Sequence, residues 1–114
     1  MRVRIPPKRP EDAIRDAISD FLMARGWYVF KTHGNAYQAG FPDLYATHTR
    51  YGQRLIEVKL PNMKGSAFTK AQWEVFPKLH ANGSRIWILT AATEEEYAKL
   101  WKESNLLYYM SSKT

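Results

Sequence analysis

The most constraining feature of the sequence is the segment Ile86–Thr90 (IWILT), in which apolar residues follow one another without alternation. A strand with one face in water alternates apolar and polar residues, so an unbroken apolar run indicates a strand that is buried on both faces. Helices are then expected on both faces of the sheet that contains this strand. The rest of the chain is therefore expected to supply neighbouring strands and the helices that cover them.

Three segments carry helical signals, either apolar residues at helical spacing or a capping box that marks the first turn. Capping boxes open the second segment at Thr69 and the third at Thr93. Pro77 is expected to kink the second helix or to cut it short, because proline has no N–H for the helical ladder. The predicted helices cover about 10–26, 69–82 and 93–104.

Strands are predicted where short β-prone segments lie next to turn signals. A turn around Arg50–Gly52 joins two of these segments, and Leu106–Met110 is expected to add a last strand at the edge of the sheet. The predicted strands cover 27–31, 44–48, 54–60, 86–90 and 106–110. The resulting order, α-β-β-β-α-β-α(-β), predicts an α/β fold in which helices flank a mixed sheet.

The composition excludes several classes of function. The chain of 114 residues contains no cysteine, which excludes disulfides, thiolate metal sites and cysteine nucleophiles. No apolar run approaches the roughly 20 residues that a membrane helix needs, and no signal-peptide core is present. The sequence therefore predicts a single domain of a cytoplasmic protein that is not attached to a membrane.

The net charge of +6 favours a polyanionic partner. Prolines at positions 6 and 7 keep residues 1–9 from forming a helix, so we expect an extended basic arm ahead of a domain at 10–114. The stretches 21–42 and 58–73 also contain no Asp or Glu. For any single basic residue, the alternative to a phosphate contact is an ordinary place on a solvated basic surface. The candidate contacts to phosphate are Arg2, Arg4, Lys8, Arg9, His33, Lys64 and Lys70.

Two charged side chains lie in a strand where apolar residues are expected. Side chains in Leu55–Leu60 (LIEVKL) alternate between the two faces, so Glu57 and Lys59 lie together on one of them. Asp43 opens the preceding strand, and pairing of the two strands would let Asp43 and Glu57 converge on one Mg²⁺ or Mn²⁺ ion. Lys59 would orient or help deprotonate a water that attacks a phosphodiester. The alternative is a surface ion pair on a solvated strand face.

Two further polar residues break the apolar pattern of their helices. Glu11 lies on the apolar stripe of the first helix, where it could bind a metal directly or through water. Its alternative role is to complement the helix dipole, with a bond to Arg15. Gln72 shares a helix face with Phe76 and could bind a water or a phosphate beside Lys59. Its alternative role is that of capping partner of Thr69.

Taken together, these residues resemble the PD-(D/E)xK nuclease superfamily, and within it a stand-alone VRR-NUC domain of the phage type. The resemblance covers about residues 10–90. Asp43, Glu57 and Lys59 match the three residues of the core motif. Glu11 matches the acid of the first helix, and Gln72 matches the glutamine that follows the motif in this branch. Pro77 departs from the pattern, because an uninterrupted helix would be expected around Gln72.

The resemblance implies a restriction-endonuclease-like core that binds Mg²⁺ or Mn²⁺ through Asp43, Glu57 and the backbone carbonyl of Val58. It also implies an endonuclease that cuts branched, junction or flap DNA in repair or recombination. Such an enzyme would act as a homodimer, and the present chain would be a phage protein that works in the host cytoplasm. Trp101 and the tail Leu106–Met110 are candidates for the dimer interface. The alternatives are a non-catalytic nucleic-acid-binding module that keeps the fold and a nuclease that is sequence-specific or directed at RNA.

Overall fold

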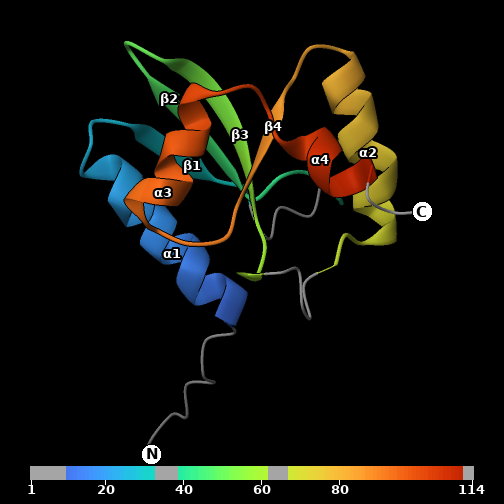
Figure 1. Ribbon diagram of the computed structural model, residues 1–114, viewed down its shortest axis with the longest axis horizontal. Helices are drawn as coiled ribbons and strands as arrows, with labels where there is room; N and C mark the ends of the chain where they lie inside the picture. Colours follow the sequence, from blue (N-terminus) through green and yellow to red (C-terminus); the bar gives the residue numbers. More distant parts are fainter. Residues whose placement is uncertain (1–9, 33–38, 62–66, 112–114) are drawn as a thin grey trace, which may run out of the picture.

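The computed structural model describes residues 10–32, 39–61 and 67–111, so the predicted basic arm at 1–9 lies outside the described part. Figure 1 shows an α/β arrangement of one sheet with helices packed around it. Along the chain the elements are α1 (Pro10–Met23), β1 (Tyr28–Lys31), β2 (Leu44–His48), β3 (Gly52–Val58), α2 (Lys70–Ala81), β4 (Ile86–Leu89), α3 (Glu94–Tyr97), the 3₁₀ helix η2 (Ala98–Trp101) and α4 (Leu106–Ser111). In the described residues, no helix has the length and apolar character that crossing a membrane requires.

The sheet is mixed and has four strands in the order β1-β2-β3-β4. The β1–β2 and β2–β3 pairs are antiparallel, and in the second pair Leu44 lies opposite Ile56. The β3–β4 pair is parallel, which requires a long connection between the two strands, and α2 provides it. Figure 1 shows β4 between the β2–β3 hairpin and α2.

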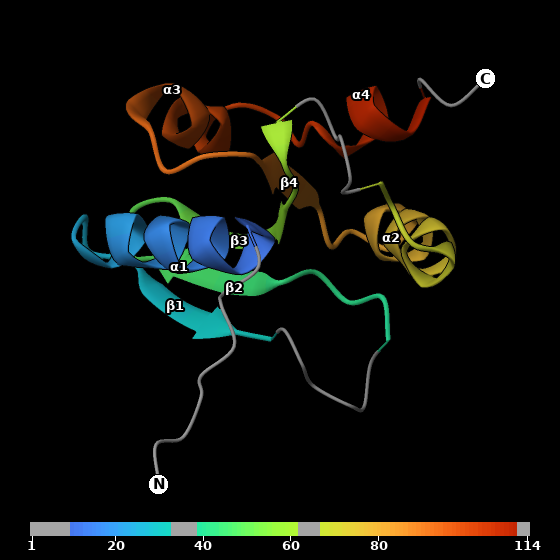
Figure 2. The same ribbon diagram turned by 90° about the horizontal axis from the view of Figure 1, so that it is seen from below.

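The core is divided by the sheet into two clusters. Figure 2 shows α1 and α3 on one side of the sheet and α2 and α4 on the other. All four residues of β4 are buried, as the unbroken apolar run predicts. Trp87 and Leu89 pack in the cluster on the α1 side, and Ile86 and Ile88 pack in the cluster on the α2 side.

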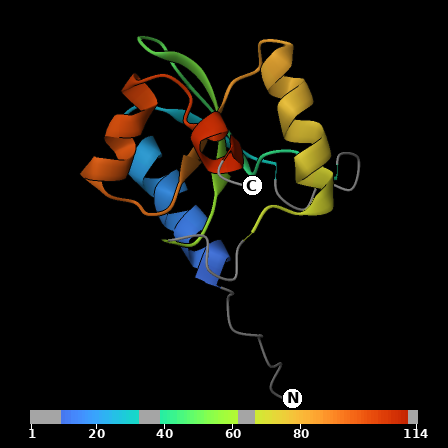
Figure 3. The same ribbon diagram turned by 45° about the vertical axis from the view of Figure 1, so that its right-hand side comes forward.

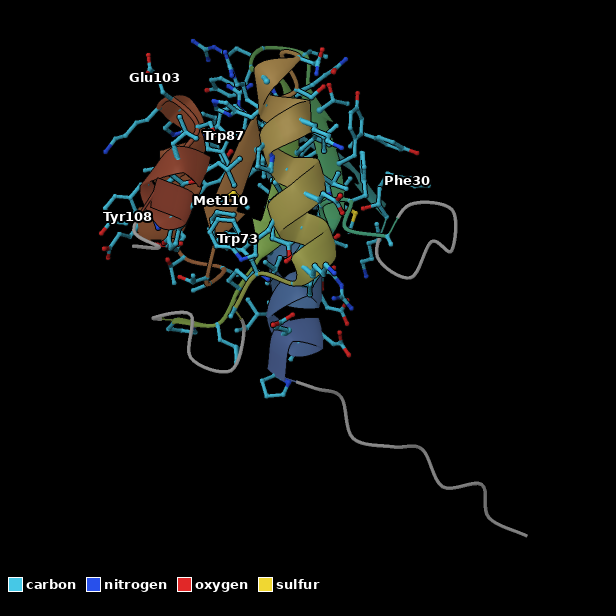
Figure 4. The ribbon with its side chains drawn as sticks, turned by 90° about the vertical axis from the view of Figure 1, so that its right-hand side faces the viewer. Phe30, Trp73, Trp87, Glu103, Tyr108 and Met110 are labelled. Carbon is cyan, nitrogen blue, oxygen red and sulfur yellow. The ribbon has the colours of Figure 1, made fainter. Side chains whose placement is uncertain are left out.

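The prediction of an edge strand at 106–110 is wrong, because this segment forms the helix α4. Leu106 and Met110 are buried four residues apart, whereas Tyr108 is 76% exposed, which is a helical rather than an alternating pattern. Figure 4 shows Met110 directed toward the protein and Tyr108 directed away from it. The outer edge of β4 is bonded by side chains instead: the Asn105 amide accepts a hydrogen bond from Ile88 N and donates one to Ile88 O.

The other differences concern where the elements end. The helix that begins after Thr93 ends at Trp101 rather than near Ser104, and its last turn is the 3₁₀ helix η2. Strand β3 covers Gly52–Val58 rather than Arg54–Leu60. Helix α2 is not cut short at Pro77 but continues to Ala81. Pro77 is exposed, so water can replace the hydrogen bond that the proline removes.

Candidate active site

The paired ends of β2 and β3 bring two carboxylates together. Because Leu44 lies opposite Ile56, Asp43 and Glu57 come next to each other one step further along the pair. The backbone N–H of Asp43 donates to Glu57 Oε1 at 3.2 Å, and the N–H of Val58 donates to Asp43 Oδ2 at 3.0 Å. The predicted approach of the two acidic side chains is therefore present in the structure.

Lys59 and Gln72 complete the cluster around Glu57. Gln72 Nε2 donates to Glu57 Oε2 at 2.8 Å, and Lys59 Nζ donates to Gln72 Oε1 at 2.9 Å. Lys59 Nζ also lies 3.4 Å from Glu57 Oε2. The amide of Gln72 therefore links the acid to the ammonium group. We call Asp43, Glu57, Lys59 and Gln72 the acid–lysine cluster.

The acid–lysine cluster is buried. Glu57 is 2% exposed and Lys59 is 3% exposed, so the alternative of an ion pair on a solvated strand face is wrong. Removing two charges from water costs several kcal/mol for each ion, and their mutual attraction offsets this cost only in part. A chain that keeps such a pair between apolar layers carries a destabilising feature, and features of this kind gather at functional sites.

Burial also changes the protonation of Glu57. Its pKa is raised to about 8, first because burial penalises the charged form and then because Asp43 is a neighbouring negative charge. Lys59 and the hydrogen bond from Gln72 act in the opposite direction. Without a further cation, burial and the charge of Asp43 therefore favour the protonated form of the Glu57 carboxyl. A divalent ion would favour the ionised carboxylate.

Gln72 performs both of the roles that the sequence allows. Its backbone N–H donates to Thr69 Oγ1 at 3.1 Å, and its side-chain oxygen accepts from Thr69 N at 3.1 Å, which completes the capping box. The same side chain contacts Glu57 and Lys59. The first turn of α2 therefore fixes the amide that positions the acid and the lysine.

The donor set at the strand ends fits a hard divalent cation. Asp43 and Glu57 supply carboxylate oxygens, and Mg²⁺ is commonly held by one or two carboxylates and several waters. The Val58 N–H donates toward Asp43. In an extended strand the C=O of a residue points to the same edge as its N–H, so the Val58 carbonyl is directed to the Asp43 side as well. Two carboxylates and one carbonyl are the ligands that the sequence resemblance implies.

Glu11 does not extend this set to three side chains. Among the described residues, no group of three or more His, Cys, Asp or Glu side chains is arranged to hold a metal ion. The N-terminal end of α1, which carries Glu11, lies at the same end of the molecule as the end of β3 (Figure 1). Arg15 pairs with Asp12 at 2.7 Å. A role for Glu11 at the metal stays a prediction.

The predicted phosphate contacts fall mostly outside the described residues. This holds for Arg2, Arg4, Lys8, Arg9, His33 and Lys64. Lys70 is described and exposed in the first turn of α2, two residues before Gln72. It is therefore the one predicted contact that the structure locates near the acid–lysine cluster.

Gly40 helps to position the site, although no sequence pattern described above singles it out. Its φ is +82°, and a Cβ added there would lie 2.8 Å from the backbone carbonyl of Ala71. The segment before Asp43 therefore packs directly against the turn of α2 that carries Gln72. The sequence has glycines at positions 34 and 40, shortly before Asp43, and glycine permits a close approach of this kind without identifying the partner.

Gly40→Ala is expected to lower the free energy of unfolding more than Gly52→Ala does. Both glycines have φ of +82°, but nothing lies within 4 Å of a Cβ at Gly52. The positive φ costs about 1 kcal/mol in either variant. Overpacking against Ala71 should add roughly 1–3 kcal/mol in Gly40→Ala alone. Urea unfolding of both variants measures the difference, and equal losses would show that the contact with Ala71 carries no weight.

The fold and the site together define an α/β protein with a buried cluster of two acids, a lysine and a glutamine at the ends of paired strands. Comparison of the chain with profiles of known protein families, with curated proteins and with solved structures found no match. The functional interpretation therefore rests on the residues of this chain and on their geometry.

Proposed function

We propose that the protein is a Mg²⁺- or Mn²⁺-dependent endonuclease that hydrolyses phosphodiester bonds in DNA, with a restriction-endonuclease-like core and a site of the PD-(D/E)xK type. The observation that supports this most is the buried contact of Asp43, Glu57, Lys59 and Gln72. A structural ion pair has no use for a second carboxylate beside the first, whereas a divalent cation is commonly held by one or two carboxylates. The raised pKa of Glu57 agrees with a site that is completed by a cation.

Each residue of the cluster has a distinct task in this proposal. Asp43, Glu57 and the Val58 carbonyl hold the ion, which supplies a Lewis acid for the phosphate and activates water. Lys59 presents its ammonium group beside Glu57, where it offsets negative charge that develops on the phosphate. Gln72 holds the Lys59 ammonium group and the Glu57 carboxylate in fixed positions through its two hydrogen bonds. Binding of the ion requires Glu57 to lose its proton.

The charge of the chain supports a nucleic acid as the substrate. The net charge is +6, and neither of two stretches next to the site residues contains an Asp or Glu: 21–42 ends just before Asp43, and 58–73 begins just after Glu57. Cations around a phosphodiester site recruit the backbone irrespective of base sequence. The preference for branched DNA, and a role of a phage protein in repair or recombination, follow from the resemblance to VRR-NUC domains alone.

The experiment that tests the proposal is a panel of labelled substrates incubated with Mg²⁺, with Mn²⁺ or with EDTA. We expect ion-dependent cleavage of four-way junctions or flaps, with slower cleavage of paired duplex. Tight DNA binding with a steep salt dependence and no cleavage under any condition would favour the non-catalytic binding module instead. Cleavage of RNA, or of one duplex sequence only, would favour a nuclease of different specificity.

A homodimer is the assembly that we propose for this activity, because a symmetric pair suits a branched substrate that is itself two-fold. Exposed apolar side chains on η2 and α4 are candidates for the interface: Trp101 is 42% exposed, Leu107 is 55% exposed and Tyr108 is 76% exposed. Sedimentation at the concentrations of the cleavage assay should give a mass of two chains. A single-chain mass at those concentrations would contradict the dimer.

A further inference from the structure

A cleft of about 440 Å³ lies between the β2–β3 hairpin and the C-terminal end of α2, and the acid–lysine cluster does not use it. Its size is within the range of roughly 300–1,000 Å³ that small-molecule sites occupy. Figure 3 shows the hairpin and the end of α2 that form its two sides, and Figure 4 shows Trp87 beside the C-terminal half of α2. The cleft therefore has room for one nucleotide-sized group.

The lining of the cleft combines aromatic faces with positive charge. Phe41 and Tyr45 contribute aromatic side chains, and the exposed Arg85 contributes a guanidinium group. Arg54 and Trp87 also line the cleft, but the Trp87 ring packs in the cluster on the α1 side with the Arg54 guanidinium 4.7 Å over it. Among the residues that the structure describes, no acid lines it. Aromatic faces beside arginines are the usual means by which proteins hold an unpaired base and its phosphate.

The two arginines have no acidic partner in the described part of the chain. Arg54 donates to the main-chain carbonyls of Leu100 and Gln53, at 3.0 and 2.9 Å. Arg85 donates to the carbonyl of His80 at 2.6 Å. Neutral carbonyls orient these guanidinium groups but do not neutralise them. The Arg54 guanidinium also lies over the Trp87 ring at 4.7 Å, so the charge that the cleft offers to an anion is that of the exposed Arg85.

The cleft is adjacent to the acid–lysine cluster on the same face of the sheet. Leu55 lines the cleft and lies two residues before Glu57, so both side chains project from one face about 7 Å apart. Tyr45 also lines the cleft and lies two residues after Asp43, so its side chain projects from the same face as that of Asp43. A strand whose phosphate reaches Glu57 would therefore bring a neighbouring nucleotide to the mouth of the cleft.

We infer that the cleft binds one unpaired nucleotide of the DNA strand next to the bond that is cut. This inference rests on the proposed nuclease function and narrows its substrate class to DNA with an unpaired nucleotide beside the scissile phosphate. The base stacks on the aromatic wall formed with Tyr45, and Arg85 at the exposed rim takes the phosphate. A paired base is held in its duplex and does not enter, which would explain a preference for flaps and branches over duplex.

The test measures binding and cleavage separately. Binding of a fluorescent eight-nucleotide oligothymidylate is measured in EDTA, where no cleavage occurs, and cleavage of a flap and of a duplex is measured with Mg²⁺. We expect Tyr45→Ala and Arg85→Ala each to weaken oligothymidylate binding at least about fivefold. We also expect both variants to slow flap cleavage more than duplex cleavage. Arg50→Ala is the matched control, because Arg50 is an exposed arginine in the hairpin turn that does not line the cleft.

A second readout does not depend on whether Tyr45→Ala folds. An oligothymidylate with one 5-iodouracil should crosslink on irradiation of the wild-type protein to Phe41 or Tyr45, and not to the exposed Tyr28 or Tyr108. Crosslinks spread over the exposed tyrosines would overturn the inference. It would also be overturned if Arg85→Ala bound the oligothymidylate with the affinity of the wild type. If Tyr45→Ala or Arg85→Ala changed the oligomeric state but not the affinity for oligothymidylate, the inference would be overturned in favour of a second copy of the chain in the cleft. The wild type could cleave no substrate while the binding and crosslinking results still hold. In that case the proposed nuclease function fails and the nucleotide site stands.

Discussion

Glu57→Gln is expected to abolish cleavage and to leave the folded protein at least as stable as the wild type. The amide keeps the size of the side chain but cannot offer a negative oxygen to a divalent ion. The ion supplies several kcal/mol of charge stabilisation, so the rate should fall by at least about 10³-fold. The stability should not fall, because Glu57 is 2% exposed and burial penalises its charged form.

Cleavage rates with Mn²⁺ and urea unfolding at pH 8 measure the two effects. Glu74→Gln is the matched control, because Glu74 is an exposed acid on α2 and the variant makes the same change of charge. It should cleave at the wild-type rate and change the free energy of unfolding by no more than about 0.5 kcal/mol. If Glu57→Gln retained wild-type activity, the nuclease would act from a different site or the activity would come from a contaminant.

The combination of lost activity and retained stability separates catalysis from structure. A polar group that served only to hold the fold would cost stability when its partner was removed. The acid–lysine cluster is different, because Glu57 lies next to Asp43, a second negative charge. Residues that are poorly matched to their surroundings until a ligand binds are typical of functional sites.

The sequence was sufficient to predict how β2 and β3 present their charged residues. Alternation along a strand has a period of two, and this period places Glu57 and Lys59 on one face whatever the rest of the fold does. The position of Asp43 follows from the same hairpin, once the register is known. The burial of Lys59 was not predictable, because it depends on α2 packing over the end of β3 through Gln72.

The sequence was not sufficient at the edge of the sheet. Leu106–Met110 can be read as an alternating strand or as a short helix, because a segment of this length allows both periods. The outcome depends on Asn105, whose side chain takes the bonding positions on Ile88 that a fifth strand would have used. The packing of Gly40 against Ala71 is also a tertiary contact that local sequence patterns do not contain.

In the absence of divalent ions, the protein is expected to lose stability as the pH rises from about 5 to 8. The pKa of Glu57 is raised from 4.5 to about 8 in the folded protein. Between these values the folded state holds a proton that the unfolded state releases, so a higher pH favours unfolding. The contribution of Glu57 is fully present below the unfolded pKa and is lost as the pH approaches the folded pKa. One pKa unit corresponds to about 1.4 kcal/mol, so a loss of a few kcal/mol is expected.

Urea unfolding in EDTA at several pH values measures this loss, and the Glu57→Gln variant isolates it from the titration of other groups. The difference between the free energies of unfolding of the wild type and the variant should grow as the pH rises, to the disadvantage of the wild type. Addition of Mg²⁺ at pH 8 should reverse the difference, because the ion binds only the folded, ionised site and stabilises it by mass action. Parallel curves for the two proteins would mean that Glu57 is ionised throughout this range. In that case Lys59 alone would neutralise the acid, and the argument that the cluster requires a divalent cation would lose its electrostatic support.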